Sequence, residues 1–305
     1  RIPMIDAQVQ DAPTLETAMV QANLGAEQMK TVPRRKFADT HRQMSFDAYR
    51  AHPDLDLIVW PESGYGSAID RSRSDLLYVT EGVPVPVLFG ATTVAFEEGG
   101  GRRVYNSAIL TSTTGARIGR FDKIRLLMFG ETLPFIDTFP ELKEWFPQSG
   151  RFDRGTDWVH LRHPDGWNML PMVCYEDLLP DFVRELTMRA GPPDVLVNIT
   201  NDSWYGDTHE PRTHLALSIF RTVETRRAMI RSTNTGISAF VDPVGRIVAQ
   251  TGQRTKETLV YDVPLRPDAG RTPFLIMGNV LGWACVLLAL VGAWMPRRAL
   301  SPSRS

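Results

Sequence analysis

Three reactive side chains follow short apolar runs of the sequence, and their chemical types complement one another. Glu62 comes directly after LDLIVWP, Lys123 follows Phe121 and Asp122, and Cys174 ends the run LPMV. A thiol with an ordinary pKa of about 8.5 is mostly protonated at neutral pH, so it needs a nearby base or cation to act as a nucleophile. Glu62 could accept that proton, and Lys123 could stabilise both the thiolate and the oxyanion of a tetrahedral intermediate. The set predicts covalent acyl transfer at a carbonyl carbon.

Each of the three residues also has an ordinary structural explanation. An acid after a strand commonly belongs to a turn, a single lysine is commonly solvated, and a single cysteine commonly packs as a small apolar side chain. No His adjoins Cys174 in the sequence. This argues against a papain-like pair, although a His distant in the sequence could still approach the thiol. A helix expected to begin near Asp177 would present backbone N–H groups close to the sulfur.

The elements that would position these residues alternate between short apolar runs and amphipathic stretches. This alternation predicts a layered α/β domain over residues 15–263, with residues 1–14 as a polar linker. Ligands and catalytic groups gather at the carboxyl ends of strands in such sheets. Strands are expected at 18–20, 55–60, 86–91, 103–110, 117–121, 169–173, 194–199, 237–241 and 246–250, and helices at 27–50, 177–189 and 209–230.

The composition is that of a folded protein with little net charge. The 305 residues are 43% hydrophobic and 23% charged, with a formal net charge of −1, so no overall field favours nucleic acid as a partner. Two cysteines, Cys174 and Cys285, are too few for a disulfide framework. Because the first residue is Arg1 and no signal peptide follows, the chain is expected to be a fragment or a processed product.

One uncharged apolar segment stands near the C-terminus. Residues 274–295 would form a helix of roughly 33 Å, enough to cross a hydrocarbon core of about 30 Å. We therefore predict a single transmembrane helix that includes Cys285 as inert packing; the alternative is a buried central helix. Residues 296–305 carry three arginines and no acid. The positive-inside tendency places this tail in the cytoplasm and the large domain outside.

Four separated motifs occur in an order that resembles the nitrilase superfamily and, within it, the bacterial apolipoprotein N-acyltransferase family. The resemblance extends over nearly the whole chain from about residue 15 and includes the apolar segment near the C-terminus. The motifs are WPES at 60–63, FDKIRLLMFGE at 121–131, MVCYED at 172–177 and NITNDSWYG at 198–206, supported by VQANL at 20–24, YNSA at 105–108 and the run 221–247.

The resemblance implies an α-β-β-α sandwich with a Glu-Lys-Cys triad, which falls on Glu62, Lys123 and Cys174. It also implies supporting roles for four further residues, without cofactor or metal. Glu131 would orient the lysine, Tyr175 and Glu176 would lie beside the nucleophile, and Asn106 would lie near the active site.

The implied reaction is a ping-pong acyl transfer. Cys174 would take an acyl chain from a phospholipid as a thioester and pass it to the α-amino group of a diacylglyceryl-modified cysteine of an apolipoprotein. The implied location is the bacterial inner membrane, with the catalytic domain on the periplasmic side. Two alternatives use the same sequence: an amidase that hydrolyses a small amide, and an inactive membrane-tethered binding domain.

The chain departs from the family pattern in two places. Family members commonly carry a His and a Pro between the triad lysine and FGE, whereas residues 124–129 here read IRLLMF. The contacts of this loop with an acceptor are therefore expected to differ. The family's N-terminal bundle of transmembrane helices has no counterpart in this sequence.

Weaker candidates for function are scattered along the chain. The histidines suggest a metal site, but their spacings match no common zinc motif. A pocket-lining role and a turn role compete for the residues that follow strand 194–199, and a salt-bridged helix face is the favoured explanation of the charges at 221–227. The residues are His160, His163, His209 and His214; Asn201, Trp204 and Tyr205; and Arg221, Glu224, Arg226 and Arg227.

Overall fold

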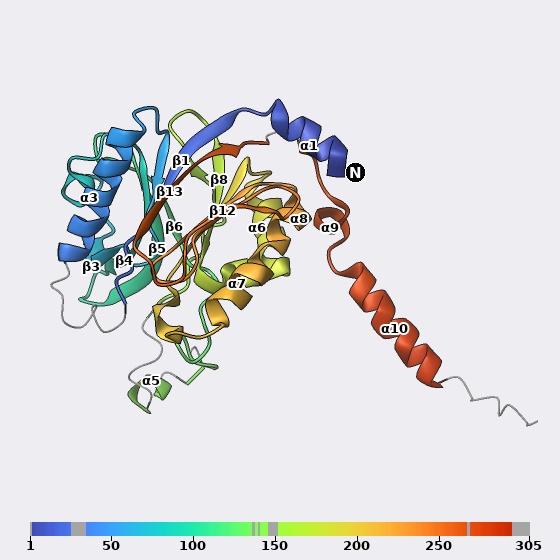
Figure 1. Ribbon diagram of the computed structural model, residues 1–305. Helices are drawn as coiled ribbons and strands as arrows, with labels where there is room; N and C mark the ends of the chain where they lie inside the picture. The colour runs from blue at the N-terminus through green and yellow to red at the C-terminus, as the bar shows by residue number, and fades with distance from the viewer. Residues whose placement is uncertain are drawn as a thin grey trace, which may run out of the picture.

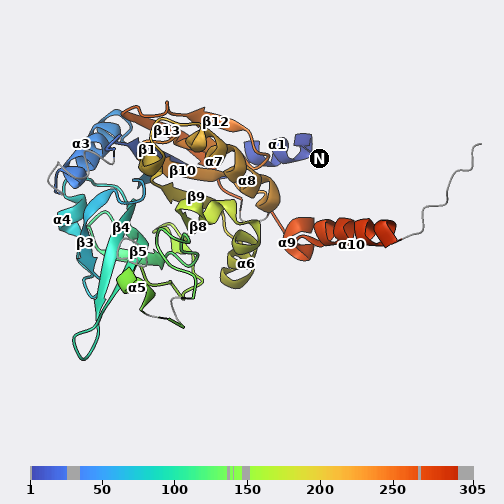
Figure 2. The same ribbon diagram turned by 90° about the horizontal axis from the view of Figure 1, so that it is seen from below.

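Two β-sheets stack face to face between outer layers of helices, which confirms the predicted α-β-β-α sandwich (Figure 1). The computed structural model describes residues 2–25, 35–135, 138–139, 141–145, 152–266 and 269–294. The view from below shows the helices on the outer sides of the paired sheets (Figure 2). Each sheet therefore has one face against the other sheet and one face against helices.

The first sheet has the strand order β13-β1-β2-β4-β5-β6, and β3 pairs with β4 beside this path. Its outer face packs against α3 (Arg35–Ala51) through a cluster that includes Ile58, Trp60 and Phe89. The strands are β1 (Thr14–Gln21), β2 (Leu57–Val59), β3 (Tyr65–Asp70), β4 (Val87–Phe96), β5 (Arg102–Thr111), β6 (Arg117–Asp122) and β13 (Glu257–Pro264), and the short helices α4 (Leu77–Thr80) and α5 (Leu142–Trp145) lie between β3 and β7 in sequence.

The second sheet has the order β12-β11-β10-β9-β8-β7, with parallel pairing of β8, β9 and β10. A second cluster fills the space between the sheets and continues to α6, and it includes Val59, Phe121, Met172 and Phe182. The elements are β7 (Leu161–Arg162), β8 (Asn168–Val173), α6 (Pro180–Ala190), β9 (Val195–Thr200), α7 (Glu210–Ser218), α8 (Phe220–Thr225), β10 (Met229–Thr233), β11 (Ala239–Val241) and β12 (Ile247–Gln250).

Most strands lie where the apolar runs predict them, but four of the described strands were not predicted, namely β3, β7, β10 and β13. The helix expected over 209–230 is wrong beyond Thr225, because Arg226 adopts a left-handed conformation with φ 58° and ends α8. Residues 27–34 of the helix expected at 27–50 lie outside the described residues, and the rest of that helix is confirmed as α3.

Both ends of the chain differ from expectation. Residues 2–10, interpreted as linker, form the helix α1 (Ile2–Gln10). The apolar C-terminal segment forms α9 (Pro273–Met277) and α10 (Val280–Trp294), separated by Gly278, whose φ of 63° is left-handed. The single helix predicted over 274–295 is therefore wrong, since a left-handed residue ends the helix before it.

None of the helices among the described residues combines the length and apolar character needed to cross a membrane. The predicted tail at 296–305 lies outside the described residues.

Candidate functional site

Glu62, Lys123 and Cys174 line one cavity of about 490 Å³, although they come from both sheets. Each follows the carboxyl end of a strand: Glu62 after β2, Lys123 after β6 and Cys174 after β8. The structure therefore brings the three predicted site residues together. Glu131 lines the same cavity, so two carboxylates, one ammonium group and one thiol share it.

A chain of short polar contacts links the two carboxylates to the lysine. Lys123 Nζ lies 2.7 Å from Glu131 Oε2, and the lysine side chain is only 1% exposed. The Asn106 amide donates to Glu62 Oε1 at 2.6 Å and to Glu131 Oε1 at 3.0 Å. Asn106 therefore holds the two acids in place while Lys123 supplies their nearest positive charge.

The charges in the cavity favour a neutral thiol beside a base of raised proton affinity. Burial raises the pKa of Glu62, and the charge of Glu131 adds to this effect while Lys123 opposes it. Burial and the charge of Glu62 raise the pKa of Cys174. Burial acts to lower the pKa of Lys123, but the neighbouring negative groups outweigh it and raise that pKa. Lys123 thus stays an ammonium ion, and the Cys174 thiol stays protonated at neutral pH.

Cys174 begins a tight turn rather than preceding a helix. Residues Cys174–Leu178 form a 3₁₀ turn, and Cys174 itself has a left-handed φ of 55°. The helix expected from Asp177 begins at Pro180 instead, because the intervening backbone groups take part in this turn. A left-handed cysteine costs about 1–2 kcal/mol, so the surrounding structure must enforce this conformation.

Glu176 joins the Cys174 strand to the loop that follows Lys123. Its side chain is fully buried and accepts hydrogen bonds from the backbone N–H groups of Ile124, Arg125 and Val173 at 2.8–2.9 Å. Burial raises the pKa of Glu176 to about 7 against the effect of these donors. Glu176 does not line the cavity, so its place is consistent with a supporting position rather than contact with a substrate.

Tyr175 points toward the same loop. Its hydroxyl donates to the carbonyl of Leu126 at 2.8 Å, and Lys123 Nζ lies 5.3 Å from the centre of its ring. The aromatic face therefore adds a weak attraction for the ammonium group.

The backbone at Glu62 rests directly on strand β4. A Cβ atom at Gly90 would lie 2.5 Å from Cα of Glu62 and 2.8 Å from the backbone nitrogen of Ser63. No side chain fits in that space. A residue without a side chain in β4 therefore sets how close Glu62 can approach the sheet.

The mouth of the cavity is apolar. Leu127, Phe152, Trp204 and Tyr205 line it together with Gly130 and Asn201. Trp204 is 77% exposed, and Phe129 on the loop after Lys123 is 70% exposed. The sequence leaves open whether Asn201, Trp204 and Tyr205 line a pocket, and the structure places all three there. No sequence motif indicates the two other apolar lining residues, Leu127 and Phe152.

The four histidines, whose spacings match no common zinc motif, do not share one site among the described residues. His209 is exposed, and the His163 ring contacts the carbonyl of Asp56 at 3.0 Å. Among the described residues, Asp202, Glu210 and His214 form the one group with ligand atoms within 4.8 Å of one another. Both ring nitrogens of His214 already contact carboxylate oxygens, so the ring must donate from both and has no lone pair for a metal.

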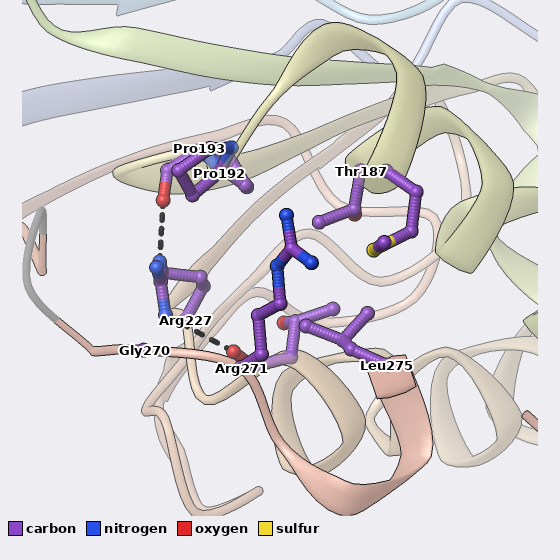
Figure 3. Close-up of a pocket in the computed structure, with 9 residues that line it drawn as sticks. Thr187, Pro192, Pro193, Arg227, Gly270, Arg271 and Leu275 are labelled. Carbon is purple, nitrogen blue, oxygen red and sulfur yellow. Dashed lines mark hydrogen bonds between the residues drawn. The ribbon is translucent and has the colours of Figure 1, made fainter. Parts of the chain in front are cut away.

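The charged residues at 221–227 lie away from the cavity. Arg221 pairs with Glu224 at 2.6 Å, as a salt-bridged helix face predicts. Arg227 is buried against the carbonyl groups of Pro193 and Thr225 and lines a hollow of about 20 Å³ (Figure 3). That space holds about one water molecule, too little for a substrate.

Comparison with known proteins identifies the class that this fold and cavity define. Residues 16–267 match the protein family described as carbon-nitrogen hydrolase. The chain therefore belongs to the carbon-nitrogen hydrolase family.

Its curated relatives are named apolipoprotein N-acyltransferase. The protein from Bdellovibrio bacteriovorus is 32% identical over 309 residues, an alignment that covers 94% of this chain and 55% of the relative. The one from Geobacter metallireducens is 33% identical, with 94% and 54% covered. The chain thus spans about half the length of the curated relatives it matches.

Solved structures support the fold. Nit3 of Saccharomyces cerevisiae, a nitrilase superfamily member, superposes with a TM-score of 0.61 at 15% identity, covering 94% of this chain and 97% of its own. An amidase variant from Nesterenkonia sp. AN1 gives a TM-score of 0.59 at 17% identity, with 83% and 92% covered. The latter carries the acetamide moiety of fluoroacetamide bonded to its active-site cysteine.

Proposed function

We propose that this chain transfers a fatty acyl group from a phospholipid, through a thioester on Cys174, to the α-amino group of the diacylglyceryl-cysteine of an apolipoprotein. The names of its curated relatives support the reaction, and the cavity supplies groups suited to each step. The proposal covers the whole reaction, although the chain matches only part of those relatives.

The apolar mouth of the cavity is the observation that favours a lipid as the substrate. Leu127, Trp204 and Tyr205 reach it, and Met128 and Phe129 extend the apolar surface along the same loop. Exposed large apolar side chains are costly in water unless something apolar covers them. An acyl chain that enters between them would bring its ester carbonyl to Cys174.

In the first half-reaction, Glu62 takes the proton from Cys174 as the sulfur attacks the ester carbonyl carbon. The Lys123 ammonium group stabilises the negative charge that develops on the carbonyl oxygen. The intermediate then expels the glycerol oxygen, which receives the proton from Glu62. The products are a Cys174 thioester and a lysophospholipid.

In the second half-reaction, the acceptor's neutral α-amino group attacks the thioester carbonyl. Glu62 takes a proton from the attacking nitrogen and returns it to the departing sulfur. An amide and a free Cys174 thiol result. One base can therefore serve both halves, since it is regenerated in each.

A small-molecule amidase is the second candidate, and the size of the cavity favours it. About 490 Å³ suits a small ligand held almost completely. The same residues would act, with water in place of the amine. The two reactions differ in the acyl donor and in the final acceptor.

We also propose that the protein works at the bacterial inner membrane, with its catalytic domain on the periplasmic side. The helix α10 carries apolar side chains around its circumference, and Leu281, Trp283 and Leu288 are 70–78% exposed. It extends away from the sandwich in both views (Figures 1 and 2). Retention in the membrane fraction after an alkaline wash, and digestion of the domain in spheroplasts but not in intact cells, would test this location.

The decisive experiment is to incubate the protein with phospholipid in mixed micelles and to search the peptide containing Cys174 for an acyl adduct by mass spectrometry. We expect an adduct that disappears when a diacylglyceryl-cysteine peptide is added, with the acyl group recovered on the peptide's α-nitrogen.

A Cys174→Ala variant is the control and should carry no adduct. Turnover of a small amide without any adduct from phospholipid would contradict the acyltransferase proposal and favour the amidase. An adduct that only water removes would contradict the proposed acceptor.

A further inference from the structure

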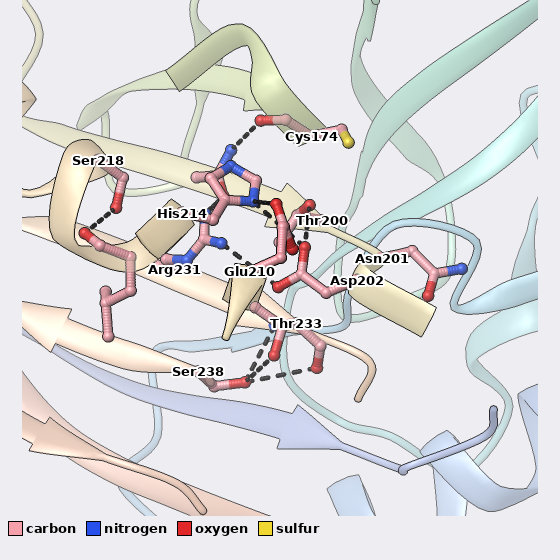
Figure 4. A network of polar contacts seen from close by, with 12 residues as sticks. Cys174, Thr200, Asn201, Asp202, Glu210, His214, Ser218, Arg231, Thr233 and Ser238 are labelled. Atoms are coloured by element: carbon pink, nitrogen blue, oxygen red, sulfur yellow. Dashed lines mark hydrogen bonds and ion pairs between the residues drawn. The ribbon is translucent and has the colours of Figure 1, made fainter. Parts of the chain in front are cut away.

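A buried polar network contacts the backbone of Cys174 (Figure 4). It joins three neighbouring strands, because Met172, Asn198 and Arg231 occupy one row across β8, β9 and β10. Asn198 and Arg231 are 0% exposed. None of the network's side chains lines the cavity, so the proposed acyl-transfer steps do not use them directly.

Asn198 holds the backbone at the nucleophile. Its amide nitrogen donates to the carbonyl oxygen of Cys174 at 3.0 Å and to that of Met172 at 3.3 Å. Its amide oxygen accepts from Arg231 Nη1 at 2.6 Å. Because Arg231 can only donate, this contact fixes the amide with its nitrogen toward the Cys174 carbonyl.

Arg231 also holds the other end of the same turn. Its Nη1 lies 2.7 Å from Asp177 Oδ2, and Asp177 lies within the 3₁₀ turn that Cys174 begins. One guanidinium group is therefore connected to the Cys174 carbonyl through Asn198 and to Asp177 directly.

His214 completes the network. Its Nε2 lies 2.9 Å from Asp177 Oδ1 and its Nδ1 lies 3.2 Å from Asp202 Oδ1. With both nitrogens donating, the ring is an imidazolium ion. Two cations, Arg231 and His214, then balance the two buried carboxylates, and Glu210 at 3.9 Å from Nδ1 is the further charge that faces the ring.

The left-handed backbone of Cys174 needs a support of this kind. The conformation is unfavourable for a residue with a side chain, yet it decides where the sulfur and the following N–H groups point. The carbonyl of Cys174 accepts a hydrogen bond from the Asn198 amide, so this contact holds the turn at its first residue.

We propose that Asn198, Arg231 and His214 are positioning residues that hold the Cys174 turn in its reactive orientation. Asn198 acts on the nucleophile through its carbonyl group, Arg231 fixes Asn198 and Asp177, and His214 keeps Asp177 in place. The inference rests on the proposed nucleophilic role of Cys174 but not on the identity of the acyl donor or acceptor.

The test measures the reactivity of the thiol, which requires neither lipid nor apolipoprotein. In a Cys285→Ala background, the rate of Cys174 alkylation by iodoacetamide is followed from pH 5 to pH 10, a range of about five units that includes the ordinary thiol pKa. The main variant is Asn198→Asp, which keeps the shape of the side chain and removes the donor to the Cys174 carbonyl. We expect alkylation at neutral pH to slow by about 10- to 100-fold, because a misplaced sulfur loses the base Glu62 and the cation Lys123, and its pH profile to move toward that of an ordinary thiol with a pKa of about 8.5.

Ser238→Ala is the matched control. Ser238 belongs to another fully buried polar network, with Gln21 and Thr233, that makes no contact with the turn (Figure 4). This variant should unfold at a lower temperature with an unchanged alkylation profile. His214→Gln, which keeps one donor, should shift the profile in the same direction as Asn198→Asp but less.

An alkylation profile of folded Asn198→Asp equal to that of the parent would overturn the proposal, as would a Ser238→Ala variant that slows alkylation equally. If Asn198→Asp does not fold, His214→Gln decides in the same way. Absence of a phospholipid adduct with a normal alkylation profile would count against the proposed function alone.

Discussion

Charged groups lie on two sides of Cys174, in the cavity and in the buried network behind the turn, and the two sides differ in their ratio of negative to positive groups. In the cavity, Glu62 and Glu131 share one cation, Lys123. Behind the turn, the buried aspartates Asp177 and Asp202 face the buried cations Arg231 and His214, and the partly exposed Glu210 lies farther away, at 3.9 Å from His214. An unbalanced set leaves one carboxylate with raised proton affinity, whereas a balanced set keeps its charges fixed. Under the proposed mechanism, the cavity side of Cys174 is suited to move a proton, and the network on the other side is suited to hold the shape of the turn.

The largest expected effect is that of Glu62→Gln, which removes one of the two negative charges in the cavity and leaves Glu131 paired with Lys123. Formation of the Cys174 adduct should slow by about 10²- to 10⁴-fold, because the general base is lost. Its rise with pH, which follows the raised pKa of Glu62, should disappear. The free energy of unfolding should stay equal or increase, since a buried acid without a full partner is removed. Adduct formation by mass spectrometry and urea unfolding check the two halves of this prediction.

A clear fall in the free energy of unfolding of Glu62→Gln would show that the cavity carboxylate stabilises the fold as the buried network behind Cys174 does. In that case the contrast between the two sides would fail, whatever happened to the rate.

The next effect concerns the buried network behind Cys174 and depends on pH. Burial and Arg231 act to lower the pKa of His214, but Asp177 and Asp202 outweigh them and raise it to about 9. A pKa raised in the folded state stabilises the protein fully below the unfolded value of about 6.5, and this contribution is lost as pH rises through about 9. The expected loss is about 3 kcal/mol at most.

Urea unfolding of the parent and of His214→Gln at several pH values measures this contribution. The difference between the two proteins should shrink as the pH rises from about 6.5 to about 9 and should stay small above that. A difference that does not vary with pH would mean that His214 is not an imidazolium ion in the fold.

The smallest effect is expected for Glu176→Gln, the counterpart of the first substitution. Three backbone N–H groups bind the Glu176 carboxylate, and an amide nitrogen would face at least one of them. The free energy of unfolding should fall by about 1–3 kcal/mol. Glu62→Gln and Glu176→Gln would then change the free energy of unfolding in opposite directions. Equal values for the two variants in urea unfolding would contradict the difference proposed between these two buried acids.

The cavity was predictable because its three reactive residues share a local signal. Each follows a short apolar run, and runs of that kind become strands whose carboxyl ends meet. The network behind Cys174 had no such signal. Arg231 contacts residues 54 and 33 positions away, and its own segment continues a helical spacing.

The same limit explains the errors in the fold. Spacing of apolar residues through 209–230 favours one helix, and nothing local indicates that Arg226 takes a left-handed φ. The polar run that becomes β3 has neither alternation nor an apolar core; pairing with β4 makes it a strand. Tertiary pairing decides these elements, and it depends on residues far away in the sequence.

Gly90 links two positions that an evolving or engineered sequence could otherwise change independently. Because the backbone of Glu62 occupies the volume that any side chain at 90 would need, a substitution there is tolerated only if the segment after β2 moves with it. Catalytic variants selected from random libraries should therefore rarely carry a change at 90 alone. A change of the residue at position 62 that moves its backbone would therefore require a compatible change in β4.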